Sequence, residues 1–495
     1  MSPQSPSRRS FLLGAAALSL KPTGIAAVAE SLLPSPSASP VTSLPPARPA
    51  LAQRRFQSSA VEALIASLKP KIADPAIAIL FENCFPNTLD TTVTTGSWEG
   101  KADTYVVTGD IDAMWLRDSS AQVVPYLPLV KSDPRLRTLV EGLIRRQGRM
   151  ILTDPYANAF LHSPTDKPLS WAVSDQTTHI PGVGERKWEI DSLCYPIRLA
   201  HGYWSAAKSL PATADNPFDD QWKATAWKIV QTFREQQRKH SPGPYSFQRE
   251  SPISTEMMPL SGFGNPARPV GLIFSGFRPS DDACIFPLFI PANLFAVNSL
   301  RQLSELATHA LNDEKLATEC LALAAEVEGA LRQYGTVHHP EHGVIWAYEV
   351  DGYGGTVLMD DANAPGLLSL AYLGCCKIDD PLYQRTRNFA LSMSNPYFFR
   401  GKYAEGIGGP HQGMNNVWPM SIMMRAFTST QDAEIRQCLR WLRDTTAGTG
   451  LMHETFHPDN PAEFTRPWFA WANTLFGELI VKLMNERPHL LTGTL

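Results

Sequence analysis

The sequence predicts a mainly α-helical protein built as an α/α barrel, with its functional groups in the connections between helices. Helical periodicity recurs from one end of the chain to the other, whereas strand-like segments are few and short. Acidic motifs fall at helix starts and in the connections between helices. Because loops at one end of a helical barrel lie close together, this layout would gather the acidic motifs into one site.

The helices are predicted from apolar residues spaced three and four apart. Such spacing covers residues 61–68, 136–144 and 472–483, and the second of these runs follows Asp133-Pro134, a common helix start. A further helix is expected to begin near Pro365, after Asp360 and Asp361. The chain shows no repeat of 30 to 50 residues, so a solenoid is not expected.

Strands are predicted at two places only. Residues 105–108 form one short strand-like run, and residues 344–350 form another that ends at a turn of Asp351-Gly352. Residues 356–359 would pair with that second run. We therefore expect short β-hairpins as insertions in a helical fold.

Composition indicates a folded globular protein. The 495 residues are 43% hydrophobic and 19% charged, with a net charge of -4. This length suits roughly two or three average domains or one large barrel. Because so small a net charge creates no field that attracts nucleic acid or an anionic membrane, neither is an expected partner.

The first 29 residues are predicted to be a twin-arginine signal peptide. Arg8-Arg9 precede Phe11-Leu12 and an apolar run to Leu20, and a small-residue cleavage site follows at 27–29. A chance arginine pair before an apolar segment is the alternative. Since the run is too short to span a bilayer, we expect a periplasmic or secreted protein with no membrane attachment after signal removal.

Residues 30–55 are predicted to be a proline-rich linker that buries nothing, so that the catalytic domain would comprise residues 56–495. Six prolines lie between Pro34 and Pro49. The seven cysteines are scattered, odd in number and without metal-ligand spacing, which is typical of core residues; at most three disulfides could form.

Acids, arginines and aromatic residues concentrate in four short tracts. These tracts are residues 110–118, 188–191 and 278–282, and His453-Glu454 together with residues 466–468. Carboxylates and guanidinium groups bind sugar hydroxyls, aromatic rings stack on the C–H faces of a pyranose, and two carboxyl groups cleave a glycosidic bond. The combination indicates a glycoside hydrolase.

The pair Asp281-Asp282 is the first catalytic candidate. Two adjacent carboxylates repel each other, and the raised pKa that results would suit a general acid. A helix cap is the alternative, since Ser280 and the two aspartates precede an apolar run. Aromatic residues and Arg278 directly before the pair favour the catalytic interpretation.

Glu454 is the second catalytic candidate. It lies in the sequence His453-Glu-Thr-Phe-His457, which has the spacing of a zinc-protease motif. Glycines before it and Pro458 after it leave no room for the helix that such a metal site needs. We therefore interpret Glu454 as a general base, held ionised by the two neighbouring histidines, that activates water.

The remaining candidates are residues that would bind sugar hydroxyls or stack on the ring. They are Asp112, Trp115, Arg117, Asp118, Trp188, Glu189, Asp191, Arg278, Asp282, Asp360, Asn363, His411, His453 and Arg466. Those at 112–118 and 188–191 could instead form a buried salt-bridge network that holds helix ends, and His411 could instead be a structural histidine. Asp110, Asp112 and Asp118 also raise the possibility of calcium. Because an EF-hand register is absent, no metal or other cofactor is predicted.

Five tracts together resemble glycoside hydrolase family 125. They are TGDIDAMWLRDSSAQ at 108–122, WEIDSLCYP at 188–196, GFRPSDDA at 276–283, MDDANAP at 359–365 and GLMHETF at 450–456. The resemblance implies an (α/α)6 barrel and a metal-independent, inverting exo-α-1,6-mannosidase whose substrate is an oligosaccharide with a terminal α-1,6-linked mannose.

Carried over by motif, the resemblance implies that Asp281 is the general acid and Glu454 the general base, with Asp282 as a substitute for the acid. Rival interpretations are another inverting α/α barrel glycosidase, such as a glucosidase or a trehalase-like enzyme, and a glycan-binding barrel without activity. The sequence does not determine the oligomeric state.

Overall fold

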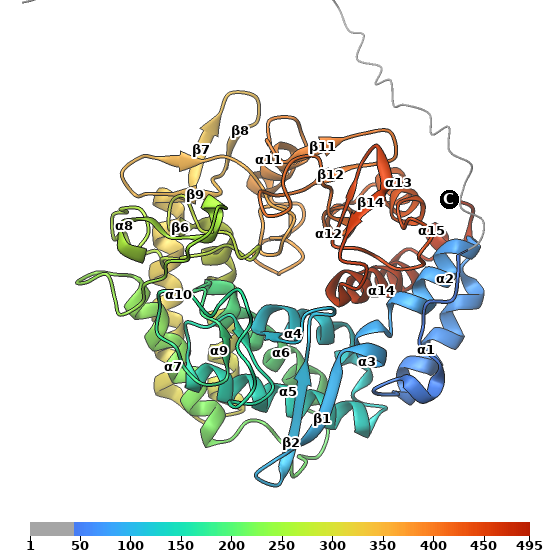
Figure 1. Ribbon diagram of the computed structural model, residues 1–495, viewed down its shortest axis with the longest axis horizontal. Coiled ribbons are helices and arrows are strands. Elements are labelled where there is room, and N and C mark those ends of the chain that lie inside the picture. The colour runs from blue at the N-terminus through green and yellow to red at the C-terminus, as the bar shows by residue number, and fades with distance from the viewer. Residues whose placement is uncertain (1–43) are drawn as a thin grey trace, which may run out of the picture. The chain divides into compact units, whose positions relative to one another are not determined.

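Helices of the protein alternate between an inner ring and an outer layer in the computed structural model, which describes residues 44–495 (Figure 1). The predicted signal peptide and the first part of the predicted linker lie outside the described residues. The inner helices are α4 (Leu116–Val123), α6 (Ile190–Ala207), α9 (Ile290–His309), α12 (Pro419–Phe427) and α14 (Ala470–Glu486). The outer helices are α2 (Pro75–Cys84), α5 (Pro134–Thr153), α7 (Asp220–Gln236), α10 (Glu314–Tyr334), α11 (Pro381–Ala390) and α13 (Asp432–Asp444).

The inner ring closes because α4 packs against both α6 and α14, while α9 packs on α6 and α12 on α14. Between α9 and α12 in the chain, the inner position is occupied by residues 364–374, a run of bends and turns with buried leucines. The expected helix near Pro365 is therefore wrong. Four short helices complete the set: α1 (Ser59–Leu68), α3 (Asn87–Thr91), α8 (Pro259–Gly262) and α15 (His489–Thr492).

Short antiparallel strands form the insertions between the helices. The pairs are β1 (Val93–Trp98) with β2 (Lys101–Val106), β7 (Thr336–His339) with β8 (Gly343–Trp346), β11 (Phe398–Arg400) with β12 (Glu405–Ile407) and β13 (Thr455–His457) with β14 (Asn460–Thr465). Two three-stranded sheets join β3 (Met114–Trp115), β4 (Ala159–Phe160) and β5 (Val183–Glu185), and β6 (Leu288–Phe289), β9 (Glu349–Val350) and β10 (Thr356–Val357).

The predicted hairpin around Asp351 is only partly right. Val350 does pair with Thr356, but residues 343–346 pair backward with β7 rather than forward. Helices at residues 61–68, 136–144 and 472–483 are confirmed as α1, α5 and α14, and residue 105 lies in β2 as expected. The all-α fold with short hairpins is thus confirmed, and so is the (α/α)6 arrangement implied by the resemblance.

Outer and inner helices begin in different ways. Outer helices α2, α5, α7, α10 and α11 each begin after an aspartate whose side chain accepts backbone N–H bonds. The five inner helices have no side-chain cap, and four of them begin after an aromatic residue, namely Trp115, Phe289, Trp418 or Phe469. Each inner helix follows a short strand in the chain. These strands are β3, β5, β6, β12 and β14. The strands and the loops that join them to the helices therefore lie at the uncapped helix ends.

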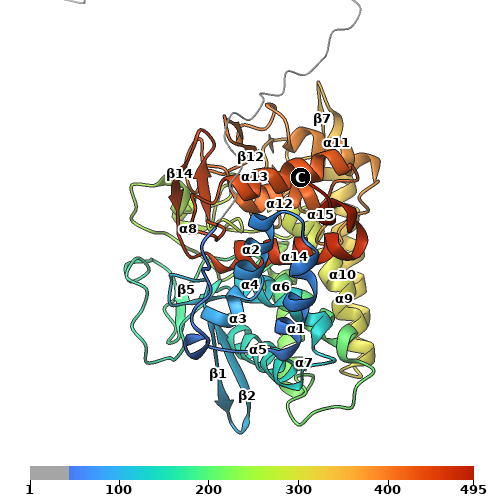
Figure 2. The same cartoon turned by 90° about the vertical axis from the view of Figure 1, so that its right-hand side faces the viewer.

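These loops project on one side of the molecule. Strands β5 and β14 and helix α8 lie there, and α9 and α10 lie on the opposite side (Figure 2). Five of the seven cysteines are buried and all seven are free thiols, as expected of core residues. None of the helices within residues 44–495 is both long and apolar enough to cross a membrane.

The described part of the predicted linker is packed on the barrel. Leu44 is buried, and the Arg48 guanidinium bonds to the carboxylates of Asp90 and Glu62 at 2.8 Å and 2.6 Å. The amide of Asn83 donates to the carbonyl of Pro45 at 3.1 Å. The prediction that the linker buries nothing is therefore wrong for residues 44–54, where the side chains of Leu44 and Arg48 are buried.

Two buried asparagines clamp loops to inner helices in the same way. Asn293 of α9 binds both the N–H and the carbonyl of Ile273, at 2.8 and 2.9 Å. Asn473 of α14 binds the N–H and the carbonyl of Met452, at 2.9 and 3.3 Å. Each asparagine is the fourth residue of its helix, so both helices hold an incoming loop near their first turn.

Replacing Asn473 by Ala should therefore lower the free energy of unfolding by about 2–4 kcal/mol, because it leaves two buried backbone groups unpaired. Asp380→Ala, which removes only the cap of the outer helix α11, is the matched control and should cost about 1 kcal/mol. Chemical denaturation measures both values. Equal losses in the two variants would show that the clamp has no special weight.

Candidate active site

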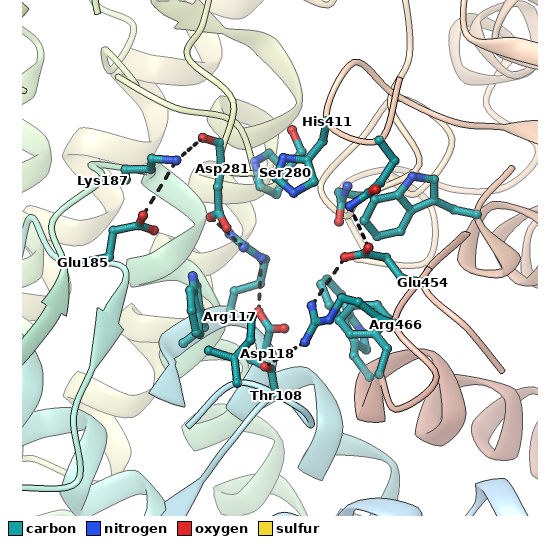
Figure 3. Close-up of a pocket in the computed structure, with 18 of the residues that line it drawn as sticks. Thr108, Arg117, Asp118, Glu185, Lys187, Ser280, Asp281, His411, Glu454 and Arg466 are labelled. Atoms are coloured by element: carbon teal, nitrogen blue, oxygen red, sulfur yellow. Dashed lines mark hydrogen bonds and ion pairs between the residues drawn. The ribbon is translucent and has the colours of Figure 1, made fainter. Parts of the chain in front are cut away.

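A polar cavity of about 310 Å³ lies at the starts of the inner helices (Figure 3). Its lining residues come from every part of the inner ring: Thr108, Ile111, Trp115, Arg117, Asp118, Trp171, Glu185, Lys187, Arg249, Glu256, Pro279, Ser280, Asp281, Asn363, His411, Gln412, Trp418, Glu454, Arg466, Phe469 and Trp471. The predicted candidates Trp115, Arg117, Asp118, Asp281, Asn363, His411, Glu454 and Arg466 are all among them. The helical ring thus brings together groups that lie up to 363 residues apart, from Thr108 to Trp471 (471 minus 108).

Arg117 lies at the centre of a cluster of carboxylates. In the first turn of α4, its guanidinium contacts Glu189 at 2.6 Å, Asp191 at 3.2 Å, Asp281 at 3.3 Å and Asp118 at 3.5 Å. The whole Arg117 side chain is buried. One cation therefore orients acids from the starts of α4 and α6 and from the loop before α9.

Burial and attraction to Arg117 shift the pKa values of this cluster in opposite directions. Burial raises the pKa of Asp118 and of Asp191 to about 6 in spite of the attraction of Arg117. Burial also raises the pKa of Glu189 well above its usual range. Glu189 is therefore the acid of this cluster that most favours its protonated form, since burial outweighs its attraction to the shared guanidinium.

Asp281, rather than Asp282, faces the cavity. Its backbone adopts a φ of +66°, in the left-handed region, so that consecutive side chains point in different directions. The side chain of Asp281 is 22% exposed and that of Asp282 is 2% exposed. Lys187 donates to the carbonyl of Asp281 at 2.8 Å, and Asn158 donates to its carboxylate at 3.2 Å.

The expected raised pKa of Asp281 is wrong for this ligand-free site. Burial opposes ionisation, but attraction to Arg117 and Lys187 outweighs burial and lowers the pKa. Crowding by Asp282 does not act as predicted, because the Asp282 side chain points to Ser280 and His411. Asp281 and Glu189 both contact Arg117. Burial raises the pKa of Glu189 while that of Asp281 is lowered, so a proton shared by these two acids rests on Glu189.

His411 forms an ion pair with Asp282. Its Nδ1 lies 3.5 Å from the carboxylate, and although burial opposes protonation, Asp282, Asp281 and Glu454 together raise the pKa of His411 to about 9. A third of the His411 side chain is accessible to solvent, which screens the interaction. At neutral pH the imidazole is therefore a cation on the cavity wall.

Glu454 lies on the opposite wall from Asp281 (Figure 3). Its carboxylate accepts hydrogen bonds from Gln412 at 2.7 Å and Thr465 at 3.1 Å, and Arg466 lies 3.4 Å away. These side chains, rather than the neighbouring His453 and His457, contact the Glu454 carboxylate. The predicted role of the histidines is wrong, and residues 455–457 form strand β13, so the zinc-protease helix is absent as expected.

His453 points away from the cavity. It is buried, stacks on Phe464 with ring centroids 3.8 Å apart, and contacts the carbonyl of Thr446. Burial lowers its pKa, which favours the neutral ring. Its role is thus to pack the loop that carries Glu454.

Three other candidates hold the walls of the cavity from behind. Arg278 is buried against Glu349 at 2.6 Å, and Glu349 also accepts two backbone N–H bonds from residues 285 and 286. Trp188 is fully buried and donates to the carbonyl of Phe274 at 2.7 Å. Asp360 accepts the N–H bonds of residues 367 and 368. Their buried polar bonds fix loops rather than face the cavity.

Three further candidates also lie off the cavity surface. Glu189 and Asp191 sit behind Arg117 with no exposed surface, and Asp112 is exposed in a separate groove beside Asp110. Asp282 acts on the cavity only through His411. Sequence patterns do not distinguish these residues from the lining ones, because neighbours within one tract point to opposite sides.

Several lining residues were not singled out from the sequence. Lys187, Gln412 and Thr108 each adjoin a recognised tract, and Trp418, Phe469 and Trp471 lie at the starts of inner helices. An aromatic residue directly before an uncapped helix was the signal that could have found the last group. Trp171, Arg249 and Glu256 come from segments without any motif.

Within the described part of the chain, two indole groups in the lining of the cavity have unpaired N–H groups. The Nε1 atoms of Trp115 and Trp418 are buried and have no hydrogen-bond partner among residues 44–495. Phe469 and Trp471 add apolar surface to the same wall. Hydroxyl groups and C–H faces of a sugar are the complementary chemistry.

A helical barrel with two carboxyl groups on opposite walls of a polar cavity defines the class of (α/α)6 glycoside hydrolases. Residues 74–481 match the family model described as metal-independent alpha-mannosidase, GH125. The chain belongs to this family. Among residues 44–495, no group of three or more His, Cys, Asp or Glu side chains is arranged to hold a metal ion.

Two relatives illustrate how closely the chain follows the family. It is 43% identical over 465 residues to the meiotically up-regulated gene 157 protein of Schizosaccharomyces pombe, covering 90% of both chains. A solved metal-independent alpha-mannosidase of Streptococcus pneumoniae is 37% identical, with a TM-score of 0.82 over 88% of this chain and 100% of that one. That structure is described as a non-productive substrate complex with alpha-1,6-mannobiose.

The His411–Asp282 pair predicts a pH-dependent contribution to stability. Because the pKa of His411 is raised from 6.5 to about 9 by folding, its stabilisation is present below about pH 6.5 and is lost as the pH rises through about 9. The difference in melting temperature between wild type and His411→Asn should thus be largest near pH 6 and small near pH 10. His240→Asn, at an exposed position outside the cavity, is the control. A difference that stays constant between these pH values would argue against the ion pair.

Proposed function

We propose that this protein is an inverting exo-α-1,6-mannosidase that removes terminal α-1,6-linked mannose from N-glycan-like or mannan oligosaccharides. The observation that carries the proposal is the placement of Asp281 and Glu454 on opposite walls of one cavity in a member of GH125. The Streptococcus pneumoniae relative, crystallised with alpha-1,6-mannobiose and connected with the processing of N-linked glycans, supports the choice of substrate.

In the proposed reaction, Asp281 is the general acid and Glu454 the general base. Glu454 removes a proton from water as the water oxygen bonds to the anomeric carbon. The bond from that carbon to the leaving oxygen breaks, and Asp281 gives its proton to this oxygen. Afterwards Asp281 is ionised again and Glu454 is protonated; Glu454 loses its proton to solvent, and solvent returns a proton to the cluster of acids around Arg117.

The proton for Asp281 is proposed to come from the cluster around Arg117. Glu189 holds a proton because burial raises its pKa, and Asp281 shares the same guanidinium. A sugar that fills the cavity displaces water from Asp281 and increases the cost of its negative charge. The proton then moves toward the acid that faces the glycosidic oxygen.

The hydroxyl groups of the terminal mannose are proposed to bind the wall formed by α4 and α12. Arg117 and Asp118 offer a donor and an acceptor, and the free indole N–H groups of Trp115 and Trp418 offer two more donors. Asn363 closes the same wall. This density of directed polar groups suits one buried sugar ring at the end of a chain.

The acid and base can be told apart with two substrates. Asp281→Asn should lower kcat/KM for α-1,6-mannobiose by about 10²–10⁴-fold but affect α-mannosyl fluoride much less, because fluoride leaves without protonation. Glu454→Gln should lower turnover of both substrates. The matched control is Asp282→Asn, whose side chain lies off the cavity. If Asp282→Asn instead shows the profile expected of the acid, the assignment of Asp281 is wrong.

Stereochemistry tests the inverting mechanism. Attack of water from the Glu454 wall, opposite the Asp281 wall, should release β-mannose first from an α-mannoside. Proton NMR during the first minutes of hydrolysis, before mutarotation, measures the anomer. Initial α-mannose would falsify the inversion and make one carboxylate a nucleophile.

The activity is proposed to need no metal. The family description as metal-independent and the placement of His453 away from the cavity support this. Dialysis against EDTA should therefore leave kcat/KM for α-1,6-mannobiose unchanged. Loss of activity that zinc or calcium restores would contradict it.

Export by the twin-arginine pathway remains a proposal that rests on residues 1–29 alone. Replacing Arg8 and Arg9 by Lys should retain the precursor in the cytoplasm of a bacterial host that has this pathway. Fractionation with a tagged chain measures the outcome. Unchanged export would show that the arginine pair is incidental.

A further inference from the structure

We propose that the side of the cavity around Trp171 binds the leaving part of the glycan, with the Trp171 indole as the stacking surface for the first sugar beyond the cleaved bond. The ligand would be a neutral hexose, since the site combines one exposed aromatic face with a few polar groups. This inference rests on the proposed mannosidase function and adds a residue that determines specificity.

Trp171 belongs to the cavity although no motif marks it. It lies in the segment of residues 161–182 that joins β4 to β5, and it lines the same cavity as Asp281 and Glu454. The residue is 42% exposed, so a large part of an apolar ring remains in contact with water. Covering that face with a sugar ring removes apolar surface from water.

The position of Trp171 relative to the two carboxyl groups indicates which sugar it meets. Lys187 donates to the Asp281 carbonyl at 2.8 Å and lies 3.8 Å from Glu185, which accepts the indole N–H of Trp171 at 3.2 Å. Lys187 and Glu185 lie on the far side of Asp281 from Glu454 (Figure 3).

In an inverting reaction, the attacking water and the leaving oxygen lie on opposite sides of the sugar ring. Water approaches from the side of the base, and the leaving oxygen departs on the side of the acid. With Asp281 as acid, the departing sugar extends toward Lys187, Glu185 and Trp171. The indole therefore faces the leaving group rather than the terminal mannose.

The indole is held by a buried framework. Glu185 accepts bonds from Arg249 at 2.9 Å and from Asn158 at 3.0 Å, and Arg249 makes a bidentate pair with Asp175 at 2.7 Å. These supporting side chains are all buried. An exposed ring on a fixed support is suited to binding, because its orientation is set before the ligand arrives.

The same framework supplies a polar neighbour. Glu256 lines the cavity, its side chain is partly exposed, and it lies 3.6 Å from Arg249. Main-chain bonds between Gln176 and Gln248 join the loop that carries Trp171 to the chain that leads to Glu256. A hexose on the indole would thus find an acceptor for its hydroxyl groups at the rim.

The test compares two substrates that share the terminal mannose and differ in the leaving group. In Trp171→Ala, kcat/KM for α-1,6-mannobiose should fall about tenfold more than kcat/KM for α-mannosyl fluoride, which has no sugar to stack. Trp171→Phe should recover most of the mannobiose rate. Melting temperatures confirm that each variant is folded.

Trp98→Ala is the matched control. Trp98 lies on the β1–β2 hairpin, is also about half exposed and contacts Arg149 of α5. It does not line the cavity. It should leave the ratio of the two rates unchanged.

Equal losses on both substrates in Trp171→Ala, or no loss on either, would overturn the inference while leaving the mannosidase function intact. Failure of the wild-type protein to cleave α-1,6-mannobiose would instead overturn the proposed function, and the inference with it.

Discussion

The guanidinium of Arg117 is the interaction on which the site depends. It is buried and contacts four carboxylates that come from the starts of α4 and α6 and from the loop before α9. Removing a buried cation of this kind leaves its partners as uncompensated charges, at a cost of about 3–5 kcal/mol for a single pair. The ring of inner helices therefore needs Arg117 to bring these acids together, and the acids in turn fix Arg117.

Inner and outer helices begin differently and have different roles in the fold. Aspartate caps close the outer helices, whereas the inner helices begin with aromatic residues and leave their first turns for loops and ligands. Asn293 and Asn473 then hold the loops that lead to Asp281 and Glu454, respectively. Since Asn473 binds Met452, two residues before Glu454, Glu454 is fixed by the same helix whose start forms the cavity wall.

Much of this arrangement could be predicted from the sequence, and the rest could not for identifiable reasons. Helical spacing and an Asp-Pro start predicted α5, and the crowded tracts placed Asp281 and Glu454 in the site. The pKa of Asp281 was mistaken, because adjacency to Asp282 in sequence does not reveal that a left-handed residue turns the two side chains apart. Trp188 and Arg278 were mistaken for sugar contacts. Both are buried behind the cavity wall, and a short sequence motif does not show which of its side chains face the cavity.

The charges of the cavity explain why a neutral sugar suits it better than an anion. Uncapped helix starts attract negative groups, and a phosphate would bind there if the first turns were free. In this cavity, carboxylates of the protein itself supply the negative charge. The lining carboxylates are Asp118, Glu185, Glu256, Asp281 and Glu454, and the lining cations are Arg117, Lys187, Arg249, Arg466 and the protonated His411. The result is a site dense in donors and acceptors but nearly balanced in charge, which rejects an additional anion and binds hydroxyl groups. Selection of a neutral glycan thus follows from the same set of carboxylates that includes the two proposed catalytic groups, Asp281 and Glu454.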